Sequence, residues 1–223
     1  MGNDRIGIIG GTGPQGRGLA MRFARAGCDV WVGSRDGARA KDTAQALNAE
    51  AGTTTIQGAE NREVVASSRW VLLTVPFDSA DATLRGLADA FRDGAVFVDV
   101  TVPLSFGKGG PSMISVPEGS GSQHLRTILP ERVPCLGSFK TLPAHVLDML
   151  DTPMNCDTFV FGDNAEAKAE WMDVVRRIPT LRPVDVGTLT SAAFVEGMTA
   201  LVIRVNRIAK SKEGRFRVVG LGE

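Results

Sequence analysis

The sequence predicts an α/β protein built on a doubly wound parallel sheet, with a small C-terminal α/β part. Three observations predict this class. Short apolar runs alternate with helical patterns, a glycine-rich turn follows the first run, and no internal repeat or clear linker interrupts the chain. Strands that alternate with helices of about 10–15 residues are typical of βαβ units, which form parallel sheets with right-handed crossovers.

The first strand is predicted at residues 5–10, where a short apolar run ends in glycines. Such a run is typical of a parallel strand that is buried on both faces. The helical pattern of residues 14–26 follows it, and residues 30–33 predict the second strand. An alanine-rich stretch at residues 38–51 predicts the second helix, with Asp36 as its N-terminal cap.

Three more strands are predicted at residues 53–57, 70–75 and 95–100, with a helix at residues 79–91 between the last two. Residues 104–121 are rich in Gly, Pro and Ser and predict a long loop. A loop of this length in a compact domain is usually functional or mobile.

The second half of the chain predicts fewer strands and one long helix. The predicted elements are a helix at residues 122–129, a strand at 135–139, a helix from 163 to 177, a strand at 182–186, and a helix from about 190 to 210. The last helix has apolar residues at helical spacing.

The sharpest motif is Gly11-x-Gly13-x-x-Gly16, placed between the first predicted strand and the first predicted helix. One glycine permits a tight turn, one lets a pyrophosphate approach the backbone, and one lets the helix pack closely on the strand. The helix N-terminus also offers free N–H groups to phosphates. The motif predicts a Rossmann-type domain at residues 1–150, with residues 151–223 packed on it. The predicted binding residues of the turn are Gly11, Thr12, Gly13, Pro14, Gln15 and Gly16.

The end of the second strand favours NADP over NAD. NAD-binding domains place an acidic residue there to accept from the ribose 2′-hydroxyl. This chain has Ser34 and Arg35, with Arg39 one helical turn later. A hydroxyl and two guanidinium groups suit a dianionic 2′-phosphate.

Two strand ends should line the groove of the dinucleotide, because ligands of parallel sheets bind at the carboxyl ends of strands. The turn Thr74-Val75-Pro76 ends one predicted strand, and Val102 follows the next. We expect these residues to contact the cofactor.

The catalytic residues are less clear from the sequence. His124 and His145 are the only histidines, and neither has a carboxylate or cysteine at ligand spacing, so we expect no metal site. Tyrosine is absent, which excludes a Tyr-x-x-x-Lys proton donor. Lys140 is the one suggestive acid. Hydride exchange between two ring cofactors would instead need mainly close placement of the rings.

Composition restricts the partners and the compartment. Lysine plus arginine and aspartate plus glutamate both number 25, so no global field favours nucleic acid or an acidic membrane. No apolar stretch predicts a membrane span. Cys28, Cys135 and Cys156 are sparse and odd in number, which favours a reducing, cytoplasmic setting.

Several segments together resemble the NADPH-dependent reductases of the deazaflavin coenzyme F420. The segments, in chain order, are Gly10-Gly11-Thr12-Gly13, Val32-Gly33-Ser34-Arg35, Thr74-Val75-Pro76, Thr141-Leu142-Pro143-Ala144, Leu181-Arg182-Pro183-Val184-Asp185-Val186-Gly187 and Val205-Asn206-Arg207, followed by Gly214 and a strand-like tail at 215–221. One position departs from the family pattern, because Lys140 stands where the family often has histidine.

The resemblance implies a homodimer that transfers a hydride reversibly between NADP(H) and F420. It implies that Thr12, Ser34, Arg35 and Arg39 hold the NADP phosphates. The deazaflavin would stack over the nicotinamide in a cleft lined by residues 101–105, by residues 140–144, which include Pro143 and Ala144, and by the C-terminal helix.

Two other functions stay open at this point. The chain could reduce another acceptor with NADPH, such as a flavin, ferric chelate, imine or ketone, with Lys140 as the proton donor. It could also be a non-catalytic NADP(H) sensor, whose basic cluster from Arg204 to Arg217 docks an acidic protein. The same cluster could hold the anionic tail of the deazaflavin, or be a solvated helix end.

Overall fold

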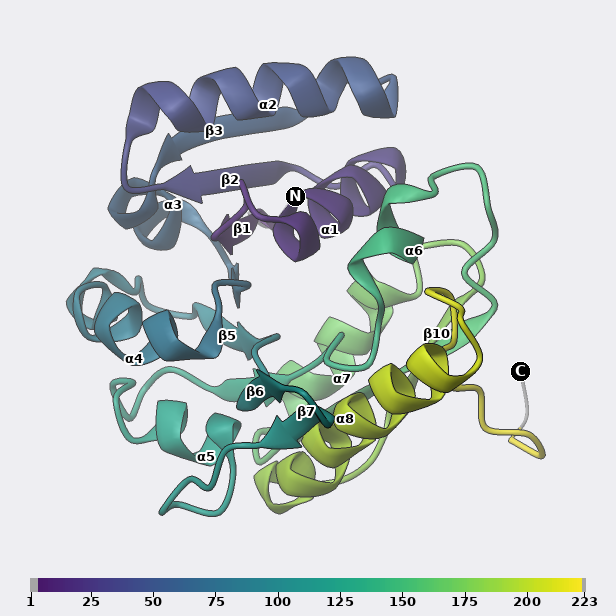
Figure 1. The fold of residues 1–223 in the computed structure, drawn as a ribbon. Coiled ribbons are helices and arrows are strands. Elements are labelled where there is room, and N and C mark those ends of the chain that lie inside the picture. Colours follow the sequence, from purple (N-terminus) through teal and green to yellow (C-terminus); the bar gives the residue numbers. More distant parts are fainter. Residues whose placement is uncertain (1–3, 222–223) are drawn as a thin grey trace.

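The structure of the chain is a computed structural model that describes residues 4–221. Its main sheet has eight strands in the order β10-β9-β8-β5-β4-β1-β2-β3 (Figure 1). The strands are β1 (Ile6–Ile9), β2 (Val30–Ser34), β3 (Ile56–Glu60), β4 (Trp70–Leu73), β5 (Val96–Asp99), β8 (Cys135–Gly137), β9 (Cys156–Gly162) and β10 (Leu181–Asp185). A separate hairpin pairs β6 (Leu104–Gly107) with β7 (Gly110–Met113).

The described part of the chain has eight α-helices. They are α1 (Pro14–Arg25), α2 (Gly37–Ala51), α3 (Asn61–Ser67), α4 (Phe77–Arg85), α5 (Gly121–Arg126), α6 (Ala144–Asp148), α7 (Ala165–Val175) and α8 (Ala192–Ile208), with short 3-10 turns at Ala88–Ala90 and Leu189–Ser191. No helix of residues 4–221 is both long enough and apolar enough to cross a membrane.

The predicted fold class is confirmed, because β1 to β5 and β8 are all parallel neighbours in a doubly wound sheet. Strand β1 pairs with β2 on one side and with β4 on the other, so the strand order reverses between β1 and β4. Ligands of open α/β sheets bind outside the carboxyl ends of the strands at such a point.

Two apolar cores lie on opposite faces of the sheet. One joins Ile8 of β1 to side chains of α1, α2, α6 and α7, with Phe23 and Trp171 in contact. The other joins Ile9 to side chains of α3, α4, α5 and α8. Adjacent residues of β1 thus face opposite cores, because successive side chains of a strand point to opposite faces of the sheet. Both faces of β1 are buried, so its sequence is a continuous apolar run.

The structure corrects several predicted elements. Residues 104–121 contain the β6–β7 hairpin rather than only a loop, and β9, α3 and α6 were not predicted. Strand β3 begins at Ile56, three residues later than expected. The predicted helix at residues 79–91 is α4, which begins at Phe77 and ends at Arg85, before a separate 3-10 turn.

The tail at 215–221 is not a strand, although it runs beside β9. The Asp157 N–H donates to the Phe216 carbonyl, the Val218 N–H donates to the Asp157 carboxylate, and the ring of Phe216 lies near that of Phe159. Residues 151–223 supply β9 and β10 to the same sheet. The division of the chain at residue 150 stays a prediction.

Candidate active site

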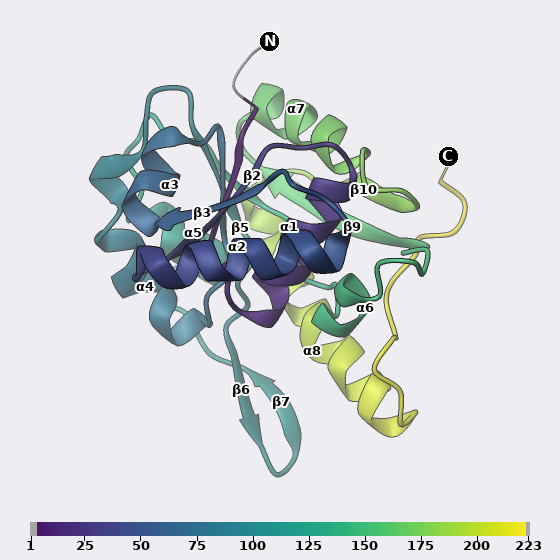
Figure 2. The same ribbon diagram turned by 90° about the horizontal axis from the view of Figure 1, so that it is seen from above.

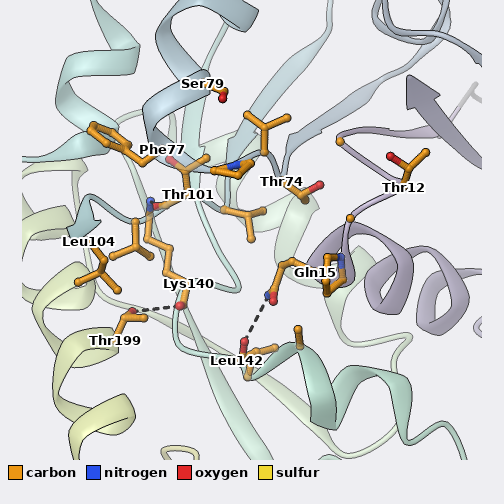
Figure 3. Close-up of a pocket in the computed structure, with 18 of the residues that line it drawn as sticks. Thr12, Gln15, Thr74, Phe77, Ser79, Thr101, Leu104, Lys140, Leu142 and Thr199 are labelled. Carbon is orange, nitrogen blue, oxygen red and sulfur yellow. Dashed lines mark hydrogen bonds between the residues drawn. The ribbon is translucent and has the colours of Figure 1, made fainter. Parts of the chain in front are cut away.

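A cavity of about 930 Å³ opens at the carboxyl ends of β1, β2, β4 and β5 (Figure 3). The glycine-rich turn and the ends of β2 and β4 form one part of its wall, and the turn after β5, residues 140–144 and α8 form another. It therefore lies at the reversal of strand order, and its volume is at the upper end of ligand sites, about 300–1,000 Å³.

The glycine-rich turn contributes to the cavity in two ways. Thr12, Gly13, Pro14 and Gln15 line it. Gly11 and Gly16 act through packing: a Cβ on Gly16 would lie 2.7 Å from the Gly10 carbonyl oxygen, and one on Gly11 would lie 2.7 Å from Cβ of Val32. These close contacts hold the start of α1 against the ends of β1 and β2. The N-terminus of α1 lines the cavity, and the first N–H groups of a helix, which have no partner within it, can stabilise an anion there.

Arg35 directly follows β2, and Arg39 lies in the first turn of α2. Ser34, Arg35 and Arg39 all line the cavity. Among residues 4–221, neither guanidinium group makes a hydrogen bond or an ion pair. Asp36 caps α2, because its carboxylate accepts from the N–H groups of Ala38 and Arg39, as predicted. The two guanidinium groups and the hydroxyl fit a phosphate monoester.

The end of β4 lies beside the glycine-rich turn. The N–H and the hydroxyl of Thr74 both donate to the Ile9 carbonyl at 2.9 Å, which fixes this strand end against β1. Thr74, Val75 and Pro76 line the cavity, and so does Val102 after β5. The residues expected to line the groove from the two strand ends therefore all line this one cavity.

The segment after β8 crosses the floor of the cavity. Phe139 has a left-handed backbone with φ 57° and is fully buried, in edge contact with Phe23. This conformation is uncommon for a large side chain, and the aromatic packing holds it. The Gln15 side-chain amide donates to the Leu142 carbonyl at 3.3 Å (Figure 3), which ties the segment to α1. Pro143 and Ala144 line the cavity.

Lys140 lies at the centre of a buried ionic network. Its side chain is inaccessible to solvent, and its ammonium group contacts the Asp99 carboxylate at 2.6 Å and that of Glu196 at 3.5 Å. The ammonium also donates to the Thr101 carbonyl. A buried cation paired in this way holds its surroundings together.

The two acidic partners of Lys140 are held by further hydrogen bonds. Asp99 accepts from the Thr101 N–H at 2.8 Å and from the Ser122 hydroxyl at 2.6 Å. Glu196 on α8 accepts from the N–H groups of Gly121 and Ser122. The network therefore joins the end of β5, the segment after β8, the start of α5 and α8 beneath the cavity.

The wall from α8 and the hairpin was predicted only in outline. Its lining residues, which come from four places in the chain, are Thr101, Leu104, Phe106, Lys140, Thr141, Thr199, Val202, Ile203 and Asn206. Figure 3 shows Thr199 beside Lys140, where the threonine hydroxyl donates to the Lys140 carbonyl at 3.0 Å. The spacing of apolar residues in α8 did not predict which face of the helix lines the cavity.

Asn61 is a further lining residue that the sequence analysis missed. It follows β3 directly and begins α3, an element that was not predicted. Because β2 and β3 are parallel and pair Ser34 with Glu60, Asn61 lies at the same sheet edge as Arg35. A correct boundary for β3 would have pointed to it.

Known proteins resemble this chain over nearly its full length. A family model described as NADP oxidoreductase, coenzyme F420-dependent, matches residues 5–103. F420-dependent NADP reductase of Methanothermobacter thermautotrophicus is 34% identical over 98% of this chain and 96% of its own length. The reductase of the same name from Methanothermobacter marburgensis is 31% identical over 98% of this chain and all of its own.

Solved structures share the fold. A crystal structure from Arthrobacter sp. FB24, described as a candidate F420-dependent NADP reductase, aligns with a TM-score of 0.80 at 24% identity. The alignment covers 96% of this chain and 98% of that one. The similarity therefore extends through α8 and is not confined to the glycine-rich turn.

Proposed function

This chain belongs to the family of coenzyme F420-dependent NADP oxidoreductases, and we propose that it transfers a hydride reversibly between NADP(H) and F420 in the cavity at the end of β1 and β4. One observation carries the proposal: a single cavity reaches from the glycine-rich turn and Arg35 to α8. A cavity of this extent gives two ring systems room to meet inside one protein.

The proposed NADP(H) site is the part formed by the glycine-rich turn and the strand ends. The first N–H groups of α1 would hold the pyrophosphate, and Ser34, Arg35 and Arg39 would hold the 2′-phosphate. Gly13 has open space above it apart from the Gly10 carbonyl oxygen at 3.3 Å, so a phosphate can approach the backbone there. The other proposed cofactor contacts are Thr12, Pro14, Gln15, Thr74, Val75, Pro76, Val102, Pro143 and Ala144.

The proposed F420 site is the part formed by the hairpin, residues 140–144 and α8. Its wall carries Val102, Leu104, Val202 and Ile203, and apolar surface of this kind suits a planar ring. The two rings supply the hydride chemistry themselves, and the residues of this chain position them and exclude water.

We propose that Lys140 is a positioning residue. A proton donor must reach its substrate, whereas the ammonium of Lys140 is buried and engaged by Asp99 and the Thr101 carbonyl. Its backbone carbonyl accepts from Thr199 of α8. Lys140 thus fixes α8 relative to the floor of the cavity.

The division of labour along the chain is also a proposal. Residues 1–150 would bind NADP(H), and residues 151–223 would complete the F420 side through α8. A homodimer is supported by exposed apolar side chains along α8, namely Phe194, Leu201, Val205 and Ile208. A cytoplasmic location is supported by the three cysteines, which are all buried thiols.

An electron-acceptor screen with NADPH tests the reaction. Purified protein is mixed with NADPH and, in turn, with oxidised F420, a flavin, a ferric chelate, an imine and a ketone. We expect rapid loss of the visible absorbance of F420 and at most slow turnover of the others. Turnover of another acceptor without F420, or NADPH binding without any turnover, would refute the proposal.

A further inference from the structure

Asn61 occupies a defined place at the edge of the cavity. It is the first residue after β3, and β3 pairs in parallel with β2, which leads into Ser34 and Arg35. Its side chain lines the same cavity as Ser34, Arg35 and Arg39. The preceding residue, Glu60, lies against Gly37 of α2 instead, since a Cβ on Gly37 would sit 3.2 Å from Cγ of Glu60.

The side-chain amide of Asn61 has no partner of its own. Within residues 4–221 it makes no hydrogen bond, and its carbonyl oxygen is buried. That oxygen lies only 2.5 Å from the position of a Cβ on Gly33, so a side chain at residue 33 would displace it. Because the oxygen is turned into the protein beside Gly33, the amide nitrogen is the atom left to face the cavity, with two hydrogen atoms to donate.

We infer that Asn61 is a further residue of the NADP(H) site, where its amide nitrogen donates to the 2′-phosphate next to Arg35 and Arg39. The inference rests on the proposed binding of NADP(H). A phosphate monoester offers three acceptor oxygens, and two arginines and one serine leave room for a neutral donor from the adjacent strand. A neutral amide at this place also adds no negative charge to the anion site.

Replacement of the amide tests the inference. Asn61→Asp keeps the shape of the side chain but replaces the donor with a carboxylate, and Asn61→Ala removes the donor alone. Gln57→Glu is the matched control, because it makes the same amide-to-acid change at an exposed position of β3 outside the described cavity wall. Dissociation constants for NADPH and NADH are measured by titration for each protein.

We expect Asn61→Asp to weaken NADPH binding by about 10- to 100-fold and Asn61→Ala by about tenfold, as expected for hydrogen bonds to a charged group. Binding of NADH should stay within about twofold of the wild type, because NADH lacks the phosphate. In steady state the KM for NADPH should rise while kcat changes little. Gln57→Glu should match the wild type in both ligands.

The outcomes separate this inference from the proposed function. If the wild type prefers NADPH, and Arg35→Ala reduces that preference but Asn61→Asp does not, only the role of Asn61 is overturned. Equal weakening of NADPH and NADH by Asn61→Asp also overturns it, because the amide would then contact something other than the 2′-phosphate. A wild type without preference for NADPH overturns both. Thermal unfolding of each variant is measured as well, to confirm that every protein in the comparison is folded.

Discussion

Arg35 and Arg39 are the residues whose guanidinium groups determine the proposed preference for NADP(H) over NAD(H). Both line the cavity, and neither is neutralised by a carboxylate of residues 4–221. The sequence indicated them directly, because a strand end and the first turn of the following helix are neighbours whatever the rest of the fold does. Local spacing is therefore enough to predict that these two residues line the same cavity.

The double variant Arg35→Ala/Arg39→Ala should lower kcat/KM for NADPH by about 10- to 100-fold and leave that for NADH nearly unchanged, because two charge-assisted contacts are lost. Steady-state rates with both nucleotides and F420 measure the ratio. Arg62→Ala is the control, since Arg62 is paired with Asp89 on the surface. An unchanged NADPH/NADH ratio in the double variant would contradict the phosphate assignment.

The network of Lys140, Asp99 and Glu196 could not have been predicted in the same way. Its members come from three distant places in the chain, and Glu196 reads in the sequence as an ordinary polar residue of an amphipathic helix. Only the packing of α8 against α5 buries it. A contact of this kind depends on tertiary structure, which a local pattern does not contain.

Lys140→Met should destabilise the protein strongly, because it leaves two buried carboxylates without their cation. Removing one partner of a buried ion pair costs about 3–5 kcal/mol, which corresponds to a drop in Tm of roughly 6–20 °C for a chain of this size. Thermal unfolding followed by circular dichroism measures it. Lys41→Met, at an exposed position of α2, should leave Tm unchanged. A Lys140→Met protein as stable as the wild type would show that the network is not structural.

The β6–β7 hairpin is the element that the sequence pattern most clearly fails to predict. Its residues are rich in Gly, Pro and Ser, which usually favour loops. The structure pairs Leu104 with Met113 and Gly107 with Gly110, so a two-residue turn closes a short hairpin. Figure 2 shows the hairpin extending away from the main sheet, so its strands pair only with each other.

Arg204 fastens this hairpin to α8. Its guanidinium group donates twice to the Pro111 carbonyl, at 2.9 and 3.2 Å. Since Leu104 and Phe106 of β6 line the proposed F420 side of the cavity, Arg204→Ala should raise the KM for F420 by about 3- to 10-fold and leave the Kd for NADPH unchanged. Arg176→Ala, at the exposed end of α7 where Arg176 pairs with Asp173, is the control. Equal effects on both substrates would contradict a local role of the hairpin.

Strand β9 was missed for a different reason. Its seven residues are all buried, but they include Asp157 and Thr158, which interrupt the apolar run. Asp157 is buried because it pairs with Arg182 of β10 at 2.9 Å, and Thr158 accepts from the Phe139 N–H. Polar residues inside a strand are satisfied by partners that only the assembled sheet provides.

His124 links α5 to α4 and gives stability a pH dependence. It bonds to Asp81 of α4 at 2.8 Å and contacts Glu118 at 3.1 Å. The contact of its Nδ1 with the Glu118 carboxylate raises the pKa of His124 above its ordinary 6.5, and the hydrogen bond with Asp81 raises it further, although partial burial opposes both. The pKa values of both carboxylates are lowered, that of Asp81 by Arg85 first and then by His124, and that of Glu118 chiefly by His124.

A raised histidine pKa stabilises the fold below the unfolded value and loses this effect as pH rises through the folded value. The carboxylates lose their contribution as pH falls through their lowered pKa values. His124→Gln should therefore destabilise the protein most near pH 6 and progressively less towards about pH 8. Urea unfolding at several pH values measures this, with His145→Gln as the exposed control. A difference that does not change with pH would contradict the link.

The parallel sheet explains why motifs that are distant in the sequence line one cavity. The strand order reverses between β1 and β4, so the turns after these strands diverge and leave the cavity between them. The order of apolar runs predicted this arrangement for the first half of the chain. The position of α8 opposite those turns was implied only by the family resemblance. The antiparallel pairing of β8 with β9 has no local sequence pattern that would predict it.

In the proposed reaction a hydride passes directly between NADPH and F420 within one cavity. Oxidised F420 is mixed with NADPH that carries deuterium on one face of the nicotinamide, each face in a separate experiment, and the reduced F420 is analysed by mass spectrometry. We expect deuterium from one face only to appear in the product, without exchange with water. Deuterium lost to water, label transferred from both faces alike, or no reduction of F420 would contradict the claim.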